Sequence, residues 1–328
     1  MSGFQIYRVK RIQGDMRLDK MLCEVYESAT FGLVQKLCRK GQIRLDGKRV
    51  KGNERVAFNQ EVKIPHALTQ QGEKKKHQPQ PLTKLQRKEV KDWIITENDD
   101  MVVLNKPYGL PVQAGSGHHK SIDRMLGSYY LEDEAADARL VHRLDKTTTG
   151  CLLLAKTKEA AKEFAKLFQS RKIEKVYWAV VYGKIRKREG VIKSFLSKET
   201  EDDGYEKMES APQVDDGIQH YPGKKIAETS YRIIDSAGFY HWLEVRPKTG
   251  RMHQIRVHLA ELGAPIVGDI KYGGEKLHND LNIKSDEVFL HARELHIAHG
   301  KKEDVFVAPM PVHFRKLFKL FEWNEKDA

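Results

Sequence analysis

The stretch LVHRLDKTTTGCLLLAKT, residues 140–157, carries the strongest structural signal in the chain. Its second half, CLLLA, is a short apolar run typical of a buried strand. The polar turn before that strand holds Asp145, and a carboxylate at the end of a strand can be partly desolvated and face a cleft. The carboxylate could instead cap the turn by accepting hydrogen bonds from the backbone amides of Thr147 or Thr148. The local pattern alone favours the cap.

Strand-like segments rich in aromatic and β-branched residues surround this turn on both sides. They are MVVLNKP at 101–107, KVYWAVVYG at 175–183, ETSYRIID at 228–235, FYHWLEVRP at 239–247 and FLHARELHIAHG at 289–300. We expect Thr157 to cap a helix that runs to about Lys172, and MHQIRVHLAELG to form a second helix that ends at Gly263. Long strands with few helices between them predict an α+β fold whose sheet is mixed, mostly antiparallel and flanked by helices.

Two of these segments carry polar or aromatic side chains that could line a site. In a strand over 175–183, Tyr177 and Trp178 point to opposite faces, so only one of them can face a given cleft. The expected helix at 252–263 begins among basic residues, namely Arg251, His253 and Arg256. A buried Arg256 would need a carboxylate partner, because an unpaired buried charge is strongly destabilising. The arginines could equally contact phosphate at the surface.

Positive charge is concentrated at the start of the chain. The 328 residues include 58 Lys and Arg against 46 Asp and Glu, a formal net charge of +12. Residues 1–91 hold 21 of the basic and 9 of the acidic residues, so the whole excess lies there and residues 92–328 carry no net charge. This asymmetry predicts a basic appendage that binds a polyanion, attached to a body with a different task. A tail that only aids solubility is the alternative.

The appendage has the pattern of a folded domain. Apolar residues at 18, 21, 22 and 25 follow helical spacing, Thr30 can cap a second helix, and Asp46-Gly47 predicts a hairpin turn. Val56, Val62 and Ile64 are expected to form a last strand. Basic side chains are interleaved with these elements, namely Lys36, Arg39, Lys40, Arg44, Lys48 and Arg49. Two helices and a small sheet with this charge predict a compact RNA-binding domain over residues 1–66.

Two polar stretches are expected to lack regular structure. Residues 67–91 are polar and basic with two prolines, which predicts an exposed linker before a second domain at 92–328. Residues 200–225 are acidic and punctuated by Gly and Pro, which predicts a surface loop or insertion.

The sequence lacks the motifs of several enzyme classes. There is no GxGxxG after a strand, no P-loop, no GxSxG, no HExxH and no zinc-deaminase signature. The three cysteines form no CxxC pair, no apolar run reaches the roughly 18 residues of a membrane span, and the first residues lack a secretory apolar core. These features predict a cytoplasmic protein with reduced thiols and no membrane contact.

The first domain resembles the small RNA-binding domain named for ribosomal protein S-four. The matching residues are RLDKML at 17–22 and the run from Gly32 to Val50, with RKGQIRLDGKRV at its centre. Domains of this kind occur in ribosomal proteins, tRNA ligases and RNA-modifying enzymes, so the resemblance implies structured RNA as a partner and not one particular activity.

The second domain resembles the RluA-type pseudouridine synthases. HRLDKTTTG at 142–150 is close to their HRLDxxTSG signature, with Thr149 in place of the usual Ser. Further matches follow in the family's order: VVLNKPYGLPV, EKVYWAVVYG, PKTGRMHQIRVHLAELGAPIVGDIKYGG and FLHAREL. The basic first domain is similar to that of the RluC-like synthases of large-subunit ribosomal RNA.

The resemblance implies a role for each matching residue. Asp145 corresponds to the essential aspartate, Tyr177 to the tyrosine that packs on the target base, and Arg256 to the arginine that pairs with the aspartate. Arg143 corresponds to the arginine that enters the RNA stack as the uridine is flipped out. We also expect RNA contacts from His142 and Arg251.

The implied reaction converts uridine to pseudouridine in RNA, with large-subunit ribosomal RNA as the expected substrate. No atoms are gained or lost, so neither a cofactor nor a metal is expected, and we expect a monomer. Two alternatives stay open at this stage. One is the same reaction on tRNA or another RNA. The other is a non-catalytic RNA-binding or ribosome-assembly factor, although such a protein would be expected to have lost Asp145, Tyr177 or Arg256.

Overall fold

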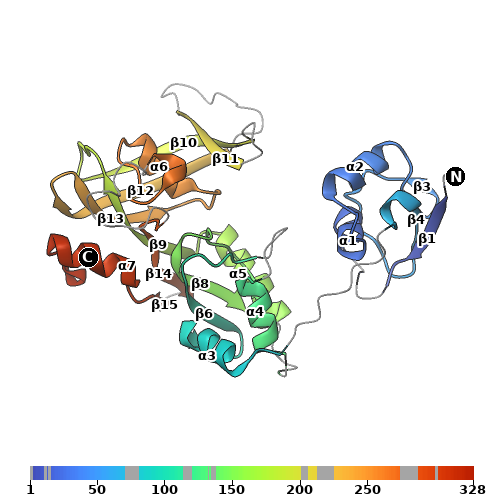
Figure 1. Ribbon diagram of the computed structural model, residues 1–328, viewed down its shortest axis with the longest axis horizontal. Helices are drawn as coiled ribbons and strands as arrows, with labels where there is room; N and C mark the ends of the chain where they lie inside the picture. The colour runs from blue at the N-terminus through green and yellow to red at the C-terminus, as the bar shows by residue number, and fades with distance from the viewer. Residues whose placement is uncertain are drawn as a thin grey trace. The chain divides into compact units, whose positions relative to one another are not determined.

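The chain divides into two compact units, Met1–Gln78 and Pro79–Ala328 (Figure 1). The computed structural model describes residues 3–10, 13, 16–70, 81–113, 120–131, 133, 138–200, 206–212, 225–273, 287–299 and 302–328. None of the helices in these residues is both long and apolar enough to span a membrane. The first unit contains the predicted RNA-binding domain and the second contains the predicted catalytic domain.

The first unit packs two helices on a four-stranded antiparallel sheet with the strand order β1-β4-β2-β3. Its elements are β1 Phe4–Arg8, α1 Leu18–Val25, α2 Phe31–Arg39, β2 Arg44–Leu45, β3 Lys48–Arg49, β4 Glu61–Pro65 and the 3-10 helix η2 His66–Leu68. The Thr30 hydroxyl accepts a hydrogen bond from the amide of Leu33, which confirms the predicted cap. Asp46 and Gly47 both have positive φ, 47° and 76°, as a two-residue hairpin turn of this kind requires.

Two details of the predicted first unit are wrong. Val56 lies outside the last strand, which begins at Glu61. Strand β1 is missing from the predicted strands, and its two alternating apolar residues, Phe4 and Ile6, are exposed and not buried.

The second unit is built on a sheet of 11 described strands in the order β11-β10-β12-β13-β9-β14-β8-β6-β5, with β15 beside β14 and β7 beside β8. All pairs are antiparallel except β14 with β8, which confirms the predicted mixed, mostly antiparallel sheet. The strands are β5 Ile94–Glu97, β6 Met101–Lys106, β7 Arg139–Leu140, β8 Thr149–Ala155, β9 Ile173–Tyr182, β10 Glu189–Thr200, β11 Glu206–Pro212, β12 Lys225–Ala237, β13 Tyr240–Pro247, β14 Leu290–His299 and β15 Lys302–Val307.

Helices flank this sheet. They are α3 Lys84–Trp93, α4 Ile122–Tyr129, α5 Lys158–Gln169, α6 Gln254–Glu261 and α7 Val312–Phe321, with the 3-10 helices η3 Ile270–Tyr272 and η5 Glu325–Asp327. The Thr157 hydroxyl caps α5 as predicted, by accepting a hydrogen bond from the amide of Ala160. Helix α5 stops at Gln169, short of Lys172, because Arg171 adopts a left-handed conformation with φ of 58° that a helix cannot continue.

The two stretches expected to lack regular structure each contain an element. Residues 84–91, assigned to the linker, belong to α3, whose start is a capping box between Thr83 and Gln86. Val90 and Trp93 of this helix are buried in the core of the second unit. Residues 206–212, assigned to a surface loop, form β11 and pair with β10. The rest of both stretches lies largely outside the described residues.

An aromatic cluster fixes the orientation of β9. The Trp178 ring packs edge-on against Trp242 at 4.9 Å between centroids and stacks on Phe318 of α7 at 6.1 Å. Tyr177, the neighbouring residue, therefore points to the opposite face of the sheet, as the strand periodicity predicted.

Candidate active site

The turn that carries Asp145 is held against the parallel pair β8–β14. Thr149 lies opposite His291 in the register, and its hydroxyl is 2.8 Å from Nδ1 of that histidine. Gly150 has a φ of +105°, and a Cβ at this position would lie 2.1 Å from the carbonyl oxygen of Ala292. The close approach of the two strands therefore requires the glycine that ends HRLDKTTTG.

A buried lysine fixes the same turn from the other side. Lys106, at the end of β6, has no exposed surface. Its Nζ donates to the carbonyls of Pro107, Lys146 and Thr148 at 2.9, 3.1 and 2.8 Å. Burial lowers the pKa of Lys106 to about 7, and the charge of Asp145 opposes this shift. An ammonium has three N–H donors, one for each carbonyl, so the lysine holds the backbone on both sides of Thr147.

The carboxylate of Asp145 faces a cluster of cationic and aromatic groups. The backbone carbonyl of Asp145 accepts the hydrogen bond from the amide of Thr148, so the main chain closes the turn. The carboxylate lies 3.5 Å from a guanidinium nitrogen of Arg256 and 3.8 Å from Nε2 of His253. The cap expected from the local pattern is therefore wrong, and the side chain faces the start of α6.

Arg256 binds a second carboxylate more tightly than it binds Asp145. Its Nε and one terminal nitrogen each donate to Asp269 at 2.7 Å, in a bidentate pair with both side chains buried. Burial alone would lower the pKa of Arg256, but the hydrogen bonds and charge of Asp269, together with the charge of Asp145, raise it. Asp269 therefore fixes the orientation of the guanidinium, and the other terminal nitrogen faces Asp145.

His253 and Tyr272 complete the wall beside this ion pair. His253 precedes α6 in a left-handed conformation with φ of 52°, and its Nδ1 is 2.9 Å from the Tyr272 hydroxyl. The guanidinium carbon of Arg256 lies 5.1 Å from the centre of the Tyr272 ring. Burial lowers the pKa of His253, with a smaller opposing effect from Asp145, which favours the neutral imidazole.

Tyr177 supplies an aromatic surface in the same cleft. It comes from the middle of β9, and its side chain is 8% exposed. Burial raises the pKa of Tyr177, and the nearby charge of Asp145 adds to the shift. The phenol is therefore protonated over the whole neutral range, and it can donate a proton or a hydrogen bond inside the cleft.

The cleft has a volume of about 810 Å³ and brings together the residues predicted for catalysis. Asp145, Tyr177 and Arg256 all line it, and so do Arg143, Arg251 and His142. Arg143 is exposed, and the Nε of Arg251 donates to the carbonyl of Ile226 at 3.3 Å. The volume suits a nucleotide-sized group better than a large folded ligand.

His142 has a structural contact in addition to its place in the cleft wall. Its Nε2 accepts a hydrogen bond of 2.9 Å from the amide of Leu153, and its ring packs on Phe168 at 4.8 Å between centroids. Burial lowers its pKa to about 3, so this imidazole carries no charge toward RNA at neutral pH.

The predicted RNA-binding residues of the first unit lie at its surface. Lys36, Arg39, Lys40, Arg44, Lys48 and Arg49 are all exposed. Lys36, Arg39 and Lys40 lie at the C-terminal end of α2, and the other three belong to the β2–β3 hairpin. The Arg49 guanidinium donates to the carbonyl of Arg39 at 3.3 Å, so the two groups adjoin.

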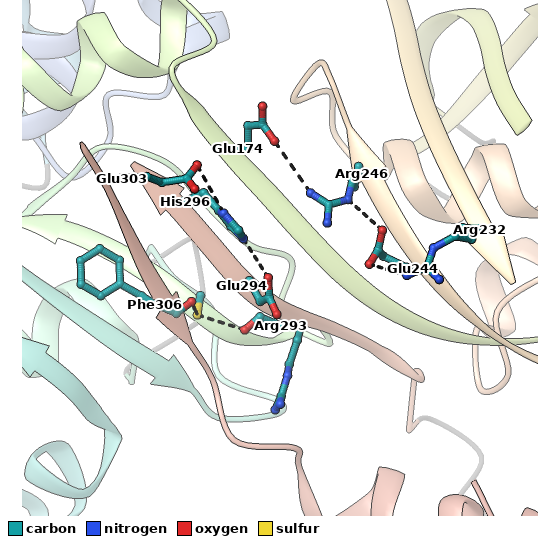
Figure 2. Close-up of polar contacts among 10 residues, drawn as sticks. Glu174, Arg232, Glu244, Arg246, Arg293, Glu294, His296, Glu303 and Phe306 are labelled. Atoms are coloured by element: carbon teal, nitrogen blue, oxygen red, sulfur yellow. Dashed lines mark hydrogen bonds and ion pairs between the residues drawn. The ribbon is translucent and has the colours of Figure 1, made fainter. Parts of the chain in front are cut away.

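An ion-pair ladder braces the strand that carries Tyr177. Figure 2 shows Arg246 between Glu174 of β9 and Glu244 of β13, with nitrogen–oxygen distances of 3.8 and 2.8 Å. Arg232 of β12 reaches Glu244 at 3.2 Å. Burial alone would raise the pKa of Glu244, but Arg246 and Arg232 outweigh it and lower the pKa. The ladder connects three neighbouring strands beside the cleft.

Sequence reasoning missed four residues of the site: Lys106, His253 as a neighbour of Asp145, Asp269 and Tyr272. Asp269 follows Gly268 in a turn, where an acidic residue is unremarkable by local pattern. Lys106 had a usable signal, since it follows the apolar run MVVL by two residues in the same expected strand and shares a face with Val102 and Leu104.

The chain thus combines a basic domain with a cleft that a carboxylate, an arginine and a tyrosine line. A family model described as RNA pseudouridylate synthase matches residues 100–261, and an S4 domain model matches residues 16–62. The ribosomal large subunit pseudouridine synthase C of Rickettsia felis is 36% identical over 311 residues, which cover 92% of this chain and 95% of the relative. The protein of the same name from Vibrio vulnificus is 31% identical over 321 residues, 95% of each chain.

A solved structure agrees with this assignment. Human RNA pseudouridylate synthase domain containing 4 superimposes with a TM-score of 0.61 at 27% identity, covering 73% of this chain and 96% of the human chain. The chain belongs to the RNA pseudouridylate synthase family and carries an S4 domain. It is an isomerase of the pseudouridine synthase class, which confirms both resemblances drawn from the sequence.

Proposed function

We propose that this enzyme isomerises specific uridines of large-subunit ribosomal RNA and that Asp145 is its catalytic residue. The observation that carries the proposal is the position of the Asp145 carboxylate, 3.5 Å from Arg256 in a cleft that also contains Tyr177. The choice of ribosomal RNA rests on the names of the relatives from Rickettsia felis and Vibrio vulnificus.

The reaction breaks the bond from C1′ of the ribose to N1 of uracil, rotates the base and joins C1′ to C5. The proton on C5 is released and N1 takes one up, so the product is an isomer of the substrate. An ionised carboxylate can attack C1′, add to the uracil ring or remove a ribose proton. In each of these routes Asp145 acts as a carboxylate, and the guanidinium of Arg256 lies 3.5 Å from it.

The target uridine must leave its stack to reach Asp145, at a cost of about a few kcal/mol. We propose that the Tyr177 ring stacks on the flipped base and recovers part of that cost, while its hydroxyl takes part in proton transfer to the uracil. Arg143, exposed at the rim of the cleft, occupies the place that the uridine vacates. A uridine in a loop or weak pair is the favoured target, because less stacking is lost.

The remaining predicted residues bind the RNA away from the reacting base. Arg251 and His142 contact the nucleotides that flank the target at the cleft wall. The exposed lysines and arginines of the S4 domain bind phosphates, namely Lys36, Arg39, Lys40, Arg44, Lys48 and Arg49. Phosphate contacts of this kind position the substrate without reading its sequence. We expect a monomer that acts in the cytoplasm, where ribosomal RNA is the available substrate.

A map of pseudouridines in total RNA, from cells with and without this protein, tests the function directly. We expect one or a few sites in large-subunit ribosomal RNA to disappear and to return when the gene is restored. Loss of sites in tRNA alone would contradict the substrate, and an unchanged map together with inactive purified protein would favour a non-catalytic RNA-binding factor.

A further inference from the structure

The solvent face of the S4 domain's sheet carries three cations in register. Lys63 of β4 lies directly opposite Arg44 of β2, and Arg44 lies directly opposite Arg49 of β3. The alternate residues of β4, Val62 and Ile64, are fully buried on the other face. Since neighbouring strands lie about 4.8 Å apart, the three cations form a row about 10 Å long. We call Lys63, Arg44 and Arg49 the cationic row.

The cationic row is unfavourable for the free domain. Like charges directly opposite each other destabilise a sheet. Among the described residues, no carboxylate forms an ion pair with any of the three. The guanidinium of Arg44 donates instead to the carbonyls of Gly41 and Gly47, at 3.3 and 3.2 Å. Three adjacent cations that have no ion-pair partner in the described part of the chain indicate a surface that binds an anion with several charges.

Apolar side chains lie at one end of the row. Ile6 of β1 is directly opposite Lys63 and is 53% exposed. Phe4, on the same face two residues earlier, is 41% exposed, and the Nζ of Lys63 lies 4.2 Å from the centre of its ring. An exposed aromatic ring beside a row of cations is the arrangement that binds unpaired nucleotides, with phosphates on the cations and a base stacked on the ring.

We propose that this sheet face binds a single-stranded segment of RNA, with phosphates along the cationic row and one base stacked on Phe4. The inference rests on RNA being the substrate, as proposed above, and adds a binding surface to it. Phe4, Ile6 and Lys63 all lie outside residues 16–62, the part that matches the S4 domain model. A duplex cannot stack a base on Phe4, so the surface selects unpaired RNA.

The test measures affinity of the full-length protein for a fluorescent RNA 12-mer made only of A and C, at two salt concentrations. The oligomer holds no uridine, so turnover does not affect the result. Phe4→Ala should weaken binding by at least about 5-fold, the lower end of the loss for one stacked base, and leave the salt dependence unchanged. Phe4→Tyr should bind like the wild type. Lys63→Gln should reduce the salt slope by about 0.7.

Two controls make the result decisive. Phe58 is 61% exposed but lies outside every strand, so Phe58→Ala should not change affinity for the 12-mer. On a blunt RNA duplex, Phe4→Ala should bind like the wild type. Wild-type affinity of Phe4→Ala for the 12-mer, or equal losses on 12-mer and duplex, would overturn the inference. Those results would leave uridine isomerisation untouched, whereas a lack of isomerisation with an intact Phe4 effect would count against the proposed function alone.

Discussion

Lys106→Met tests whether the buried lysine holds the turn that carries Asp145 in position. The substitution nearly keeps the volume of the side chain but removes the donor to three backbone carbonyls. The contact with the Thr148 carbonyl, at 2.8 Å, is fully buried. Each lost hydrogen bond from a charged group is worth about 1.5–3 kcal/mol, and Met regains part of the cost of burying a charge. We expect a net loss of about 2–4 kcal/mol in the free energy of unfolding.

The turn should also lose its fixed position, so the carboxylate of Asp145 should shift in the cleft. A displacement of about 1 Å in a catalytic group can lower the rate about 100-fold. Urea unfolding and single-turnover isomerisation of an RNA fragment measure the two effects on the same preparation. Lys146→Met is the matched control, because that side chain is exposed in the same turn. A folded Lys106→Met protein with wild-type turnover would refute the role assigned to the lysine.

Three further predictions follow from the contacts of the cleft and the division of the chain. Tyr177→Phe should bind and flip the uridine but stall before product release, and full activity in a single-turnover assay would mean that only the ring matters. Arg256→Met should lose both activity and about 3–5 kcal/mol of stability in urea unfolding, because it leaves the buried Asp269 unpaired. Normal turnover by the folded variant would make that arginine purely structural. Removing residues 1–78, which hold 17 basic and 8 acidic residues, should flatten the salt dependence of RNA binding while a short saturating fragment is still modified. Equal losses of activity on the fragment and on intact ribosomal RNA would contradict this separation.

Much of the fold could be predicted from local signals. The helices with a hydroxyl cap at Thr30 or Thr157, the hairpin at Asp46-Gly47 and the aromatic strands all form, because each has a strong local cause. Helix α3 was missed although its signal was present: Thr83 and Gln86 have capping-box spacing, and only Val90 and Trp93 need burial. The polar composition of these residues favoured a linker over a helix.

The candidate site was predictable only in part. The resemblance predicted that Asp145, Tyr177 and Arg256 act at one site. The structure places all three in one cleft. Asp269 could not be found in this way, because its contact with Arg256 depends on how the chain returns after α6. The prediction that the Asp145 side chain caps the turn was wrong for a similar reason. A backbone carbonyl closes that turn, and this depends on the conformation of the turn and not on residue type.

Asp145→Asn tests the central claim most directly. The change keeps the volume of the side chain and removes its charge, so affinity for an RNA fragment that contains the target uridine should stay close to that of the wild type. Single-turnover conversion of that uridine to pseudouridine should fall by about 10³-fold or more, as expected for the loss of a nucleophile or general base. A folded Asp145→Asn protein that keeps more than a few per cent of wild-type turnover would contradict the assignment of Asp145 as the catalytic residue.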